Sequence, residues 1–351
     1  MTPAEFDEML LELKQSLPLE KNLELITQAI VKAQQMAYPL GQAQALVCRG
    51  EYLLTTGEQP SVARKDFRDA ALIARQLKNW KLLAQVLHWQ AQSQLMQGEY
   101  LRALDIWLQA LQVAIEAEDS RAFIQGYAGI AQVCLVFKQL DISQEYQRRA
   151  LALAENLDDI LLQVECLLAV IASCYQQQQF DEMQLLLERL HRKLQIKPQL
   201  EAQAEFHIYT GLIYLDRDQL DMAYEHLQLA QVLAHQFGGL WCRAYSALIL
   251  GRIYHRQNKL EAARTMLEQC LVLAENIRGF SLTQEAHELL ETLCAQQGDY
   301  AGALMHLECI HTQQLSLLQK QAERKLTRMF HKQLNQLEMS LRLELGHFRY
   351  S

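Results

Sequence analysis

The chain has 351 residues and a formal net charge of −8, half of its residues are hydrophobic, and it contains only 5 Pro and 14 Gly. This composition favours an all-α protein. The acidic balance argues against a broad nucleic-acid surface, and no apolar run is long enough for a membrane span. The opening residues, Met-Thr-Pro-Ala-Glu-Phe-Asp-Glu, do not have the pattern of a signal peptide, so we expect a cytoplasmic protein.

The N-terminal residues predict two short helices. The first covers residues 3–16 and ends near Pro18, and the second covers residues 20–37 and ends before Pro39 and Gly41. One face of the second helix carries Leu23, Ile26, Ile30 and Ala33. Because terminal repeats of helical arrays are atypical, we interpret residues 1–40 as an N-terminal helical cap or degenerate repeat.

From Gly41 a two-helix unit recurs about every 40 residues. Pro60 and Pro198 are each expected to open a helix, where a missing N–H costs nothing. The copies cover about 41–78, 80–119, 120–158, 160–196, 198–238, 240–278 and 280–319. The residues that open the second helices are Tyr100, Leu140, Phe180, Leu220, Leu260 and Tyr300. Such regular self-similarity predicts a solenoid, in which each pair buries its apolar stripe against its neighbours.

Small residues mark the positions where the two helices of a pair can approach closely. The clearest copy has Gly251, Ala263 and Cys270 there, and Asn258 is expected to end its first helix in the left-handed conformation. The copy that begins near Ile160 has Ile171 and Met183 at such positions. Looser packing is therefore expected in that copy.

The order small–aromatic–turn–aromatic–Ala–hydrophobic–Ala resembles the tetratricopeptide repeat (TPR). The matching positions are Gly211, Tyr214, Ala223, Leu227 and Ala230, and then Leu250, Gly251, Tyr254, Ala263, Leu267 and Cys270. The longer period is similar to that of Rap-type peptide receptors, MalT-type regulators and TPR regions ahead of diguanylate cyclase domains. The resemblance implies a right-handed α-solenoid of about seven TPR-like helix pairs over residues 41–312.

The C-terminal residues 313–351 predict an extended helix and tail, because no Gly or Pro interrupts the pattern between Ile310 and Leu345. A helix from Tyr300 to Leu345 would be roughly 70 Å long, too long for one neighbouring helix to cover. We expect its apolar stripe to pack in a partner, in a second copy or in the groove of its own solenoid. The stripe, our candidate for oligomerisation, consists of Leu326, Phe330, Leu334, Leu337 and Leu341. The basic segment 320–332 is interpreted as solvated surface or a contact with the acidic repeats.

No catalytic motif stands out, and no cofactor or metal is expected. His306 and His311 are interpreted as surface histidines without a third ligand. None of the eight Cys forms a C-x-x-C pair. Cys134, Cys174, Cys270 and Cys294 occupy repeat positions that predict small core residues, which fits a reducing compartment.

The TPR resemblance implies that the first helix of each pair lines the concave face. The candidates for a ligand groove are Gln85, His88, Gln92, Gln125, Gln132, Tyr175, Tyr245, Arg252, His255 and Arg256, with Glu165, Glu205, Leu212 and Leu215 on the same face. Arg252 and Arg256, beside Tyr245 and His255, would suit a carboxylate or phosphate on a bound peptide. They would equally suit local pairing with acidic residues.

These features predict a non-enzymatic scaffold that binds a protein or peptide in its groove and uses the C-terminal helix for homodimerisation or signal output. The alternative is a regulatory or sensor module of a bacterial signalling system, of the cyclic-dinucleotide or transcriptional kind, acting in trans or as a degenerate relative. An enzyme, such as a Rap-type phosphatase, lacks an identifiable nucleophile or base in this sequence.

Overall fold

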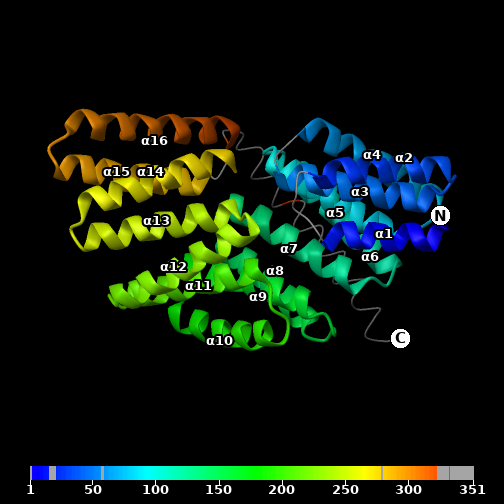
Figure 1. Cartoon of the computed structure of the whole chain (residues 1–351), viewed down its shortest axis with the longest axis horizontal. Helices are drawn as coiled ribbons and strands as arrows, with labels where there is room; N and C mark the ends of the chain where they lie inside the picture. The colour runs from blue at the N-terminus through cyan, green and yellow to red at the C-terminus, as the bar shows by residue number, and fades with distance from the viewer. Residues whose placement is uncertain (1, 16–20, 57–58, 278–279, 322–331, 333–351) are drawn as a thin grey trace. The chain divides into compact units, whose positions relative to one another are not determined.

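The computed structural model describes residues 2–15, 21–56, 59–277, 280–321 and Lys332, and every regular element in those ranges is an α-helix (Figure 1). Consecutive helices pack against each other as pairs, and within each of two compact units the pairs stack on their neighbours. The prediction of an all-α solenoid of TPR-like helix pairs is confirmed. Among the described helices, none is long and apolar enough to cross a membrane.

The described helices form two compact units. Unit 1, up to Leu157, contains α1 (Pro3–Gln15), α2 (Lys21–Gln35), α3 (Pro39–Thr56), α4 (Pro60–Gln76), α5 (Trp80–Met96), α6 (Tyr100–Glu116), α7 (Ser120–Val136) and α8 (Leu140–Ala154). Unit 2, from Asp158, contains α9 (Ile160–Gln176), α10 (Phe180–Ile196), α11 (Leu200–Asp216), α12 (Leu220–Phe237), α13 (Leu240–Arg256), α14 (Leu260–Asn276), α15 (Phe280–Gln296) and α16 (Tyr300–Gln321). One continuous solenoid over 41–312, with a separate cap, stays a prediction.

A left-handed residue after most of the described helices explains the repeat period. Most helices have 17 residues, and a three-residue connection brings each step to 20. The middle residue of the connection has positive φ at Lys78, Gly98, Glu118, Lys138, Gln178, Asp218, Asn258 and Gly298, and Gly238 has positive φ at the same position of the repeat although α12 ends one residue later. The next N–H then donates to a carbonyl five residues back, as from Lys259 to Tyr254 at 2.9 Å. The expectation for Asn258 is confirmed.

The connection between α10 and α11 departs from this pattern because Pro198 occupies the left-handed position. Proline is restricted to φ near −65°, so it cannot adopt positive φ. Its neighbours are extended instead, with φ −135° at Lys197 and −138° at Gln199. The prediction that Pro198 opens a helix is wrong, since α11 begins at Leu200, whereas Pro60 does open α4.

The first helices of the pairs, which carry odd numbers from α3 onward, form an inner layer in each unit. In unit 1, α3 contacts α5 and α5 contacts α7; in unit 2, α9, α11, α13 and α15 contact one another in turn. Within the described parts of each unit, no two second helices make a comparable contact. Side chains from successive repeats can therefore meet on the face of the first helices.

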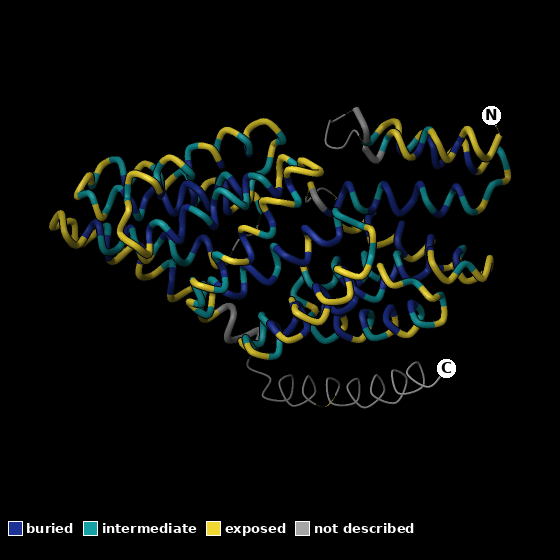
Figure 2. The backbone as a smooth tube through the Cα atoms, turned by 90° about the horizontal axis from the view of Figure 1, so that it is seen from below, coloured by how far each residue is buried: buried dark blue, intermediate teal, exposed yellow. Residues whose placement is uncertain are grey.

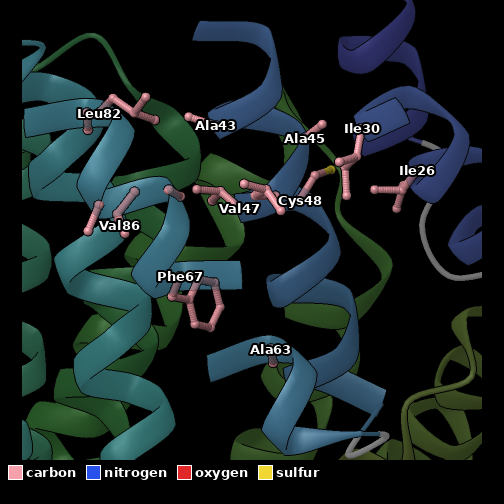
Figure 3. Close-up of a cluster of buried hydrophobic side chains, with 14 of the residues drawn as sticks. Ile26, Ile30, Ala43, Ala45, Val47, Cys48, Ala63, Phe67, Leu82 and Val86 are labelled. Carbon is pink, nitrogen blue, oxygen red and sulfur yellow. The ribbon is translucent and has the colours of Figure 1, made fainter. Parts of the chain in front are cut away.

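Buried apolar side chains fill the space between the helices, and Figure 2 shows buried and exposed stretches alternating along them. In Figure 3, Cys48 of α3 points toward Ile30 of α2, while Val47 points to the opposite side, toward Val86 of α5. Ala263 and Cys270 are fully buried, as expected. All eight Cys are free thiols, and only Cys309 is not fully buried. The predicted oligomerisation stripe, Leu326 to Leu341, lies outside the described residues.

Candidate ligand-binding face

Arg252 joins three first helices of unit 2. Its Nη1 donates a hydrogen bond of 3.1 Å to the hydroxyl of Tyr175 on α9, and its Nη2 forms an ion pair with Glu285 on α15. Two of the groove candidates, Tyr175 and Arg252, are thus brought together across 77 residues of sequence. The guanidinium crosslinks α9, α13 and α15 on their inner face.

Aromatic side chains lie close to this crosslink. Tyr245 is only 8% exposed, and burial raises the pKa of its hydroxyl well above the usual range, with smaller contributions from Tyr175 and Tyr209. The ring of Trp241 lies 5.1 Å from that of Tyr245, and its side chain remains 38% exposed. This face therefore carries tyrosine hydroxyl groups that are neutral near pH 7 and the partly exposed indole of Trp241.

Glu205 is the carboxylate on this face that is most strongly affected by its surroundings. Burial, reinforced by the nearby charge of Glu201, raises the pKa of Glu205 to about 8. Among the described residues, Glu205 has no hydrogen bond or ion pair. Cys242 lies close to Glu205. Burial of the Cys242 thiol raises its pKa, and the charges of Glu205 and Glu201 raise it further. A cation next to Glu205 would therefore favour its ionised form.

Glu285 differs from Glu205 because it has a partner. Burial raises the pKa of Glu285 more than the neighbouring Arg252 lowers it. Glu165, Glu205, Tyr245 and Glu285 occupy equivalent positions in four successive first helices. Sequence reasoning included the first three and missed Glu285, although the 40-residue register points to it. Glu201, Tyr209 and Trp241 were also missed, since only packing between helices brings them to this face.

His255 and Arg256 bind to neighbouring helix ends. The Nε2 of His255 lies 3.0 Å from Oε1 of Gln296 on α15. Nη1 of Arg256 donates to the carbonyl of Leu215 at 2.8 Å and lies 3.4 Å from Asp218. Both arginines thus make local ion pairs with acidic residues, Arg252 with Glu285 and Arg256 with Asp218.

The candidates in unit 1 lie on α5 and α7, which contact each other. Nδ1 of His88 accepts a 3.5 Å hydrogen bond from the indole of Trp107, and burial lowers the pKa of His88 to about 4. His88 is therefore a neutral acceptor within the α5–α6 pair. The other candidates are half-buried on the first helices or, for Gln132, exposed: Gln85, Gln92, Gln125 and Gln132.

His306 is not the surface residue that its sequence position predicted. It is 8% exposed, and its Nδ1 lies 2.9 Å from Nδ1 of His287. No group of three or more His, Cys, Asp or Glu side chains with the geometry of a metal site occurs in the described part of the chain.

No protein-family model and no curated protein matches the chain. Many solved structures are similar to it, including two Rap proteins and a phosphatase. The Rap protein complexed with Competence and Sporulation Factor is 16% identical, with a TM-score of 0.66 over 91% of this chain and 89% of that one. The Rap conjugation gene regulator of the plasmid pLS20, in complex with the Phr* peptide, is 13% identical, with a TM-score of 0.64 over 82% and 77%.

The third structure is aspartyl phosphate phosphatase F from Bacillus subtilis, which is 13% identical with a TM-score of 0.55 over 97% of this chain and 94% of that one. At these identities the likeness concerns the fold. The expected resemblance to Rap-type repeats is confirmed, and the chain has the TPR-type helical-repeat fold.

Proposed function

We propose that this chain is a non-enzymatic binding protein, and that a peptide or extended protein segment binds along the inner face of α9, α11, α13 and α15. The observation that carries the proposal is the crosslink from Arg252 to Tyr175 and Glu285. It holds three first helices in register, so the face is organised before a ligand arrives, which lowers the entropic cost of binding.

The charges on this face favour a basic residue in the bound segment. Glu205 is half-buried and has no hydrogen bond or ion pair among the described residues, while Arg252 is already paired with Glu285. A lysine or arginine side chain could neutralise Glu205. The partly exposed ring of Trp241, on the neighbouring first helix α13, offers a surface for a cation–π contact. A ligand carboxylate at Arg252 would instead have to compete with Glu285.

The similar structures support a peptide as the ligand class, since two of them are complexes with Competence and Sporulation Factor and with the Phr* peptide. A third is named a phosphatase. Burial raises the pKa of the Cys134, Cys166 and Cys270 thiols to about 12, so these cysteines are protonated near neutral pH. A protonated thiol is a poor nucleophile, which argues against covalent catalysis by these residues.

The proposed location, the class of partner and the role of the C-terminal stripe rest mainly on the sequence. A reducing, cytoplasmic location accounts for free cysteines packed in the core, and the charge of −8 favours protein over nucleic-acid partners. The C-terminal stripe from Leu326 to Leu341 would serve dimerisation or signal output. The same role fits the alternative function, a signalling module that acts in trans.

The test uses two fluorescein-labelled heptapeptide pools, randomised except for a central arginine or a central glutamate, and fluorescence polarisation with the full chain. We expect the arginine pool to bind about tenfold more tightly, a difference of about 1.4 kcal/mol. Glu205→Gln should abolish that preference, and Glu225→Gln, on the second helix α12, should keep it. Equal binding of both pools, or a preference that survives Glu205→Gln, would count against the proposal.

A further inference from the structure

A cavity of about 450 Å³ opens between α10 and α11, on a different face of α11 from the one that carries Glu205. Its walls combine apolar rings and aliphatic side chains with guanidinium groups at the rim. This volume is within the range of small-molecule sites in proteins.

The cavity arises where two sequence features separate helices that pack closely elsewhere in unit 2. Pro198 replaces the tight left-handed turn with an extended connection, and α11 contacts α10 less extensively than the other consecutive helices of unit 2 contact one another. Ile171 and Met183, both fully buried, stand where the next repeat has Gly211 and Ala223, and α9 and α10 pack less closely than the other pairs of this unit. The expectation of looser packing in this copy is thus confirmed.

Two rings in the cavity wall are held in place by histidines. Phe206 stacks on His191, with centroids 5.2 Å apart and planes at 27°. Tyr214 stacks on His226, with centroids 5.3 Å apart and planes at 23°. Together with Leu187 and Ile213, these two rings offer an apolar surface for a flat ring of a ligand. Because the stacking already fixes both rings, binding orders few further side chains and loses little conformational entropy.

The rim carries more positive than negative charge. Arg192 and Arg217 line it, with Glu188 as the carboxylate beside them. Nη2 of Arg217 donates to Oε1 of Gln184 at 2.6 Å, which ties α11 to α10 across the opening. Among the described residues Arg192 has no hydrogen bond or ion pair, so its guanidinium is available. In a chain with net charge −8, such a rim selects an anionic group.

We propose that the cavity between α10 and α11 binds a small aromatic carboxylate, with its ring against Phe206 and Tyr214 and its carboxylate on Arg192 and Arg217. Because the occupant contacts both helices, it bridges the most open junction of unit 2. The site is independent of the inner face, so either proposal can fail without the other.

The test compares three ligands that share a phenol ring and differ in charge: 4-hydroxyphenylacetate, 4-ethylphenol and tyramine. Binding to the full chain is measured by saturation-transfer NMR and isothermal calorimetry. We expect the anion to bind at least about tenfold more tightly than the other two, since one charge-assisted contact contributes about 1.5–3 kcal/mol.

Arg192→Gln should weaken binding of 4-hydroxyphenylacetate about tenfold, and Arg217→Gln should do the same. Arg189→Gln is the matched control, because this residue lies on the same helix outside the cavity lining. Arg192 is exposed, so Arg192→Gln should leave folding intact. This variant therefore tests the proposal even if Arg217→Gln misfolds. No binding of the anion at millimolar concentration, equal affinity for the three ligands, or an affinity that Arg192→Gln leaves unchanged would overturn the proposal.

Discussion

The Nδ1 atoms of His207 and His226 lie 2.9 Å apart and join α11 to α12, and His287 and His306 repeat the contact at the same distance between α15 and α16. One ring of each pair must donate and the other accept, so each contact requires at least one neutral ring. Burial lowers the pKa of all four histidines, for His207 to about 4, and Glu225 partly opposes the shift at His226.

These shifts predict loss of stability in mild acid. A histidine whose folded pKa is depressed contributes fully above its unfolded pKa of about 6.5 and loses that contribution as pH falls toward the folded value. We expect the free energy of unfolding, measured with urea, to fall between pH 6.5 and 4. The variant His207→Gln, His287→Gln should show a shallower decline. Parallel pH profiles for the two proteins would contradict this assignment.

The repeat register made most of the fold predictable. Tyr100, Leu140 and Phe180 begin helices as expected, because the tight turn repeats at a constant interval. The register failed at Pro198, where the requirement for positive φ was not recognised. Partners in the candidate site were harder to predict. The TPR resemblance predicted that Arg252 lies on the face of the first helices. Its pairing with Glu285 depends on the spacing between α13 and α15, which no local sequence pattern encodes.

Two glycines at close contacts between neighbouring helices, Gly129 and Gly251, predict different losses of stability when each is replaced by alanine. A Cβ on Gly129 would lie 2.0 Å from the Trp107 ring, and one on Gly251 would lie 2.8 Å from Leu267. Overpacking typically costs about 1–3 kcal/mol. Both side chains are fully buried, but the overlap with the rigid indole is larger than the overlap with the flexible leucine side chain, so we expect Gly129→Ala to destabilise more than Gly251→Ala. Urea titrations of both variants check the order, and equal midpoints would contradict it.

The ion pair between Arg49 and Asp66 predicts a large effect in unit 1. Nε and Nη2 of Arg49 each donate to a carboxylate oxygen of Asp66 at 2.7 Å, linking α3 to α4, and the Asp66 side chain is 2% exposed. Removing the guanidinium leaves a buried carboxylate without its partner, which costs about 3–5 kcal/mol in comparable cases. Arg49→Met should therefore destabilise strongly, as measured by urea unfolding.

The double variant Arg49→Met, Asp66→Leu supplies the control for that measurement. Replacing both partners removes the unpaired charge, so it should recover much of the lost stability. If the double variant is as unstable as Arg49→Met, lost packing rather than an unpaired carboxylate explains the effect.

Replacing Arg252 connects stability to the candidate binding face. Arg252→Gln removes the ion pair with Glu285 and the guanidinium that reaches Tyr175. The Arg252 side chain is 27% exposed and that of Glu285 is 39% exposed, so solvent screening limits the expected loss to about 1 kcal/mol. Arg149→Gln, which breaks an exposed pair with Glu145 on α8, should cost less, about 0.3–0.5 kcal/mol.

The same substitution should alter ligand preference in a direction that separates positioning from direct contact. Without Arg252, Glu285 becomes a second unpaired carboxylate on the face, which favours basic peptides electrostatically but loosens the contacts among α9, α13 and α15. We expect the arginine-centred pool to dissociate faster from Arg252→Gln, while its preference over the glutamate-centred pool persists. If Arg252 itself held a ligand carboxylate, the wild-type chain would prefer the glutamate-centred pool and Arg252→Gln would lose that preference.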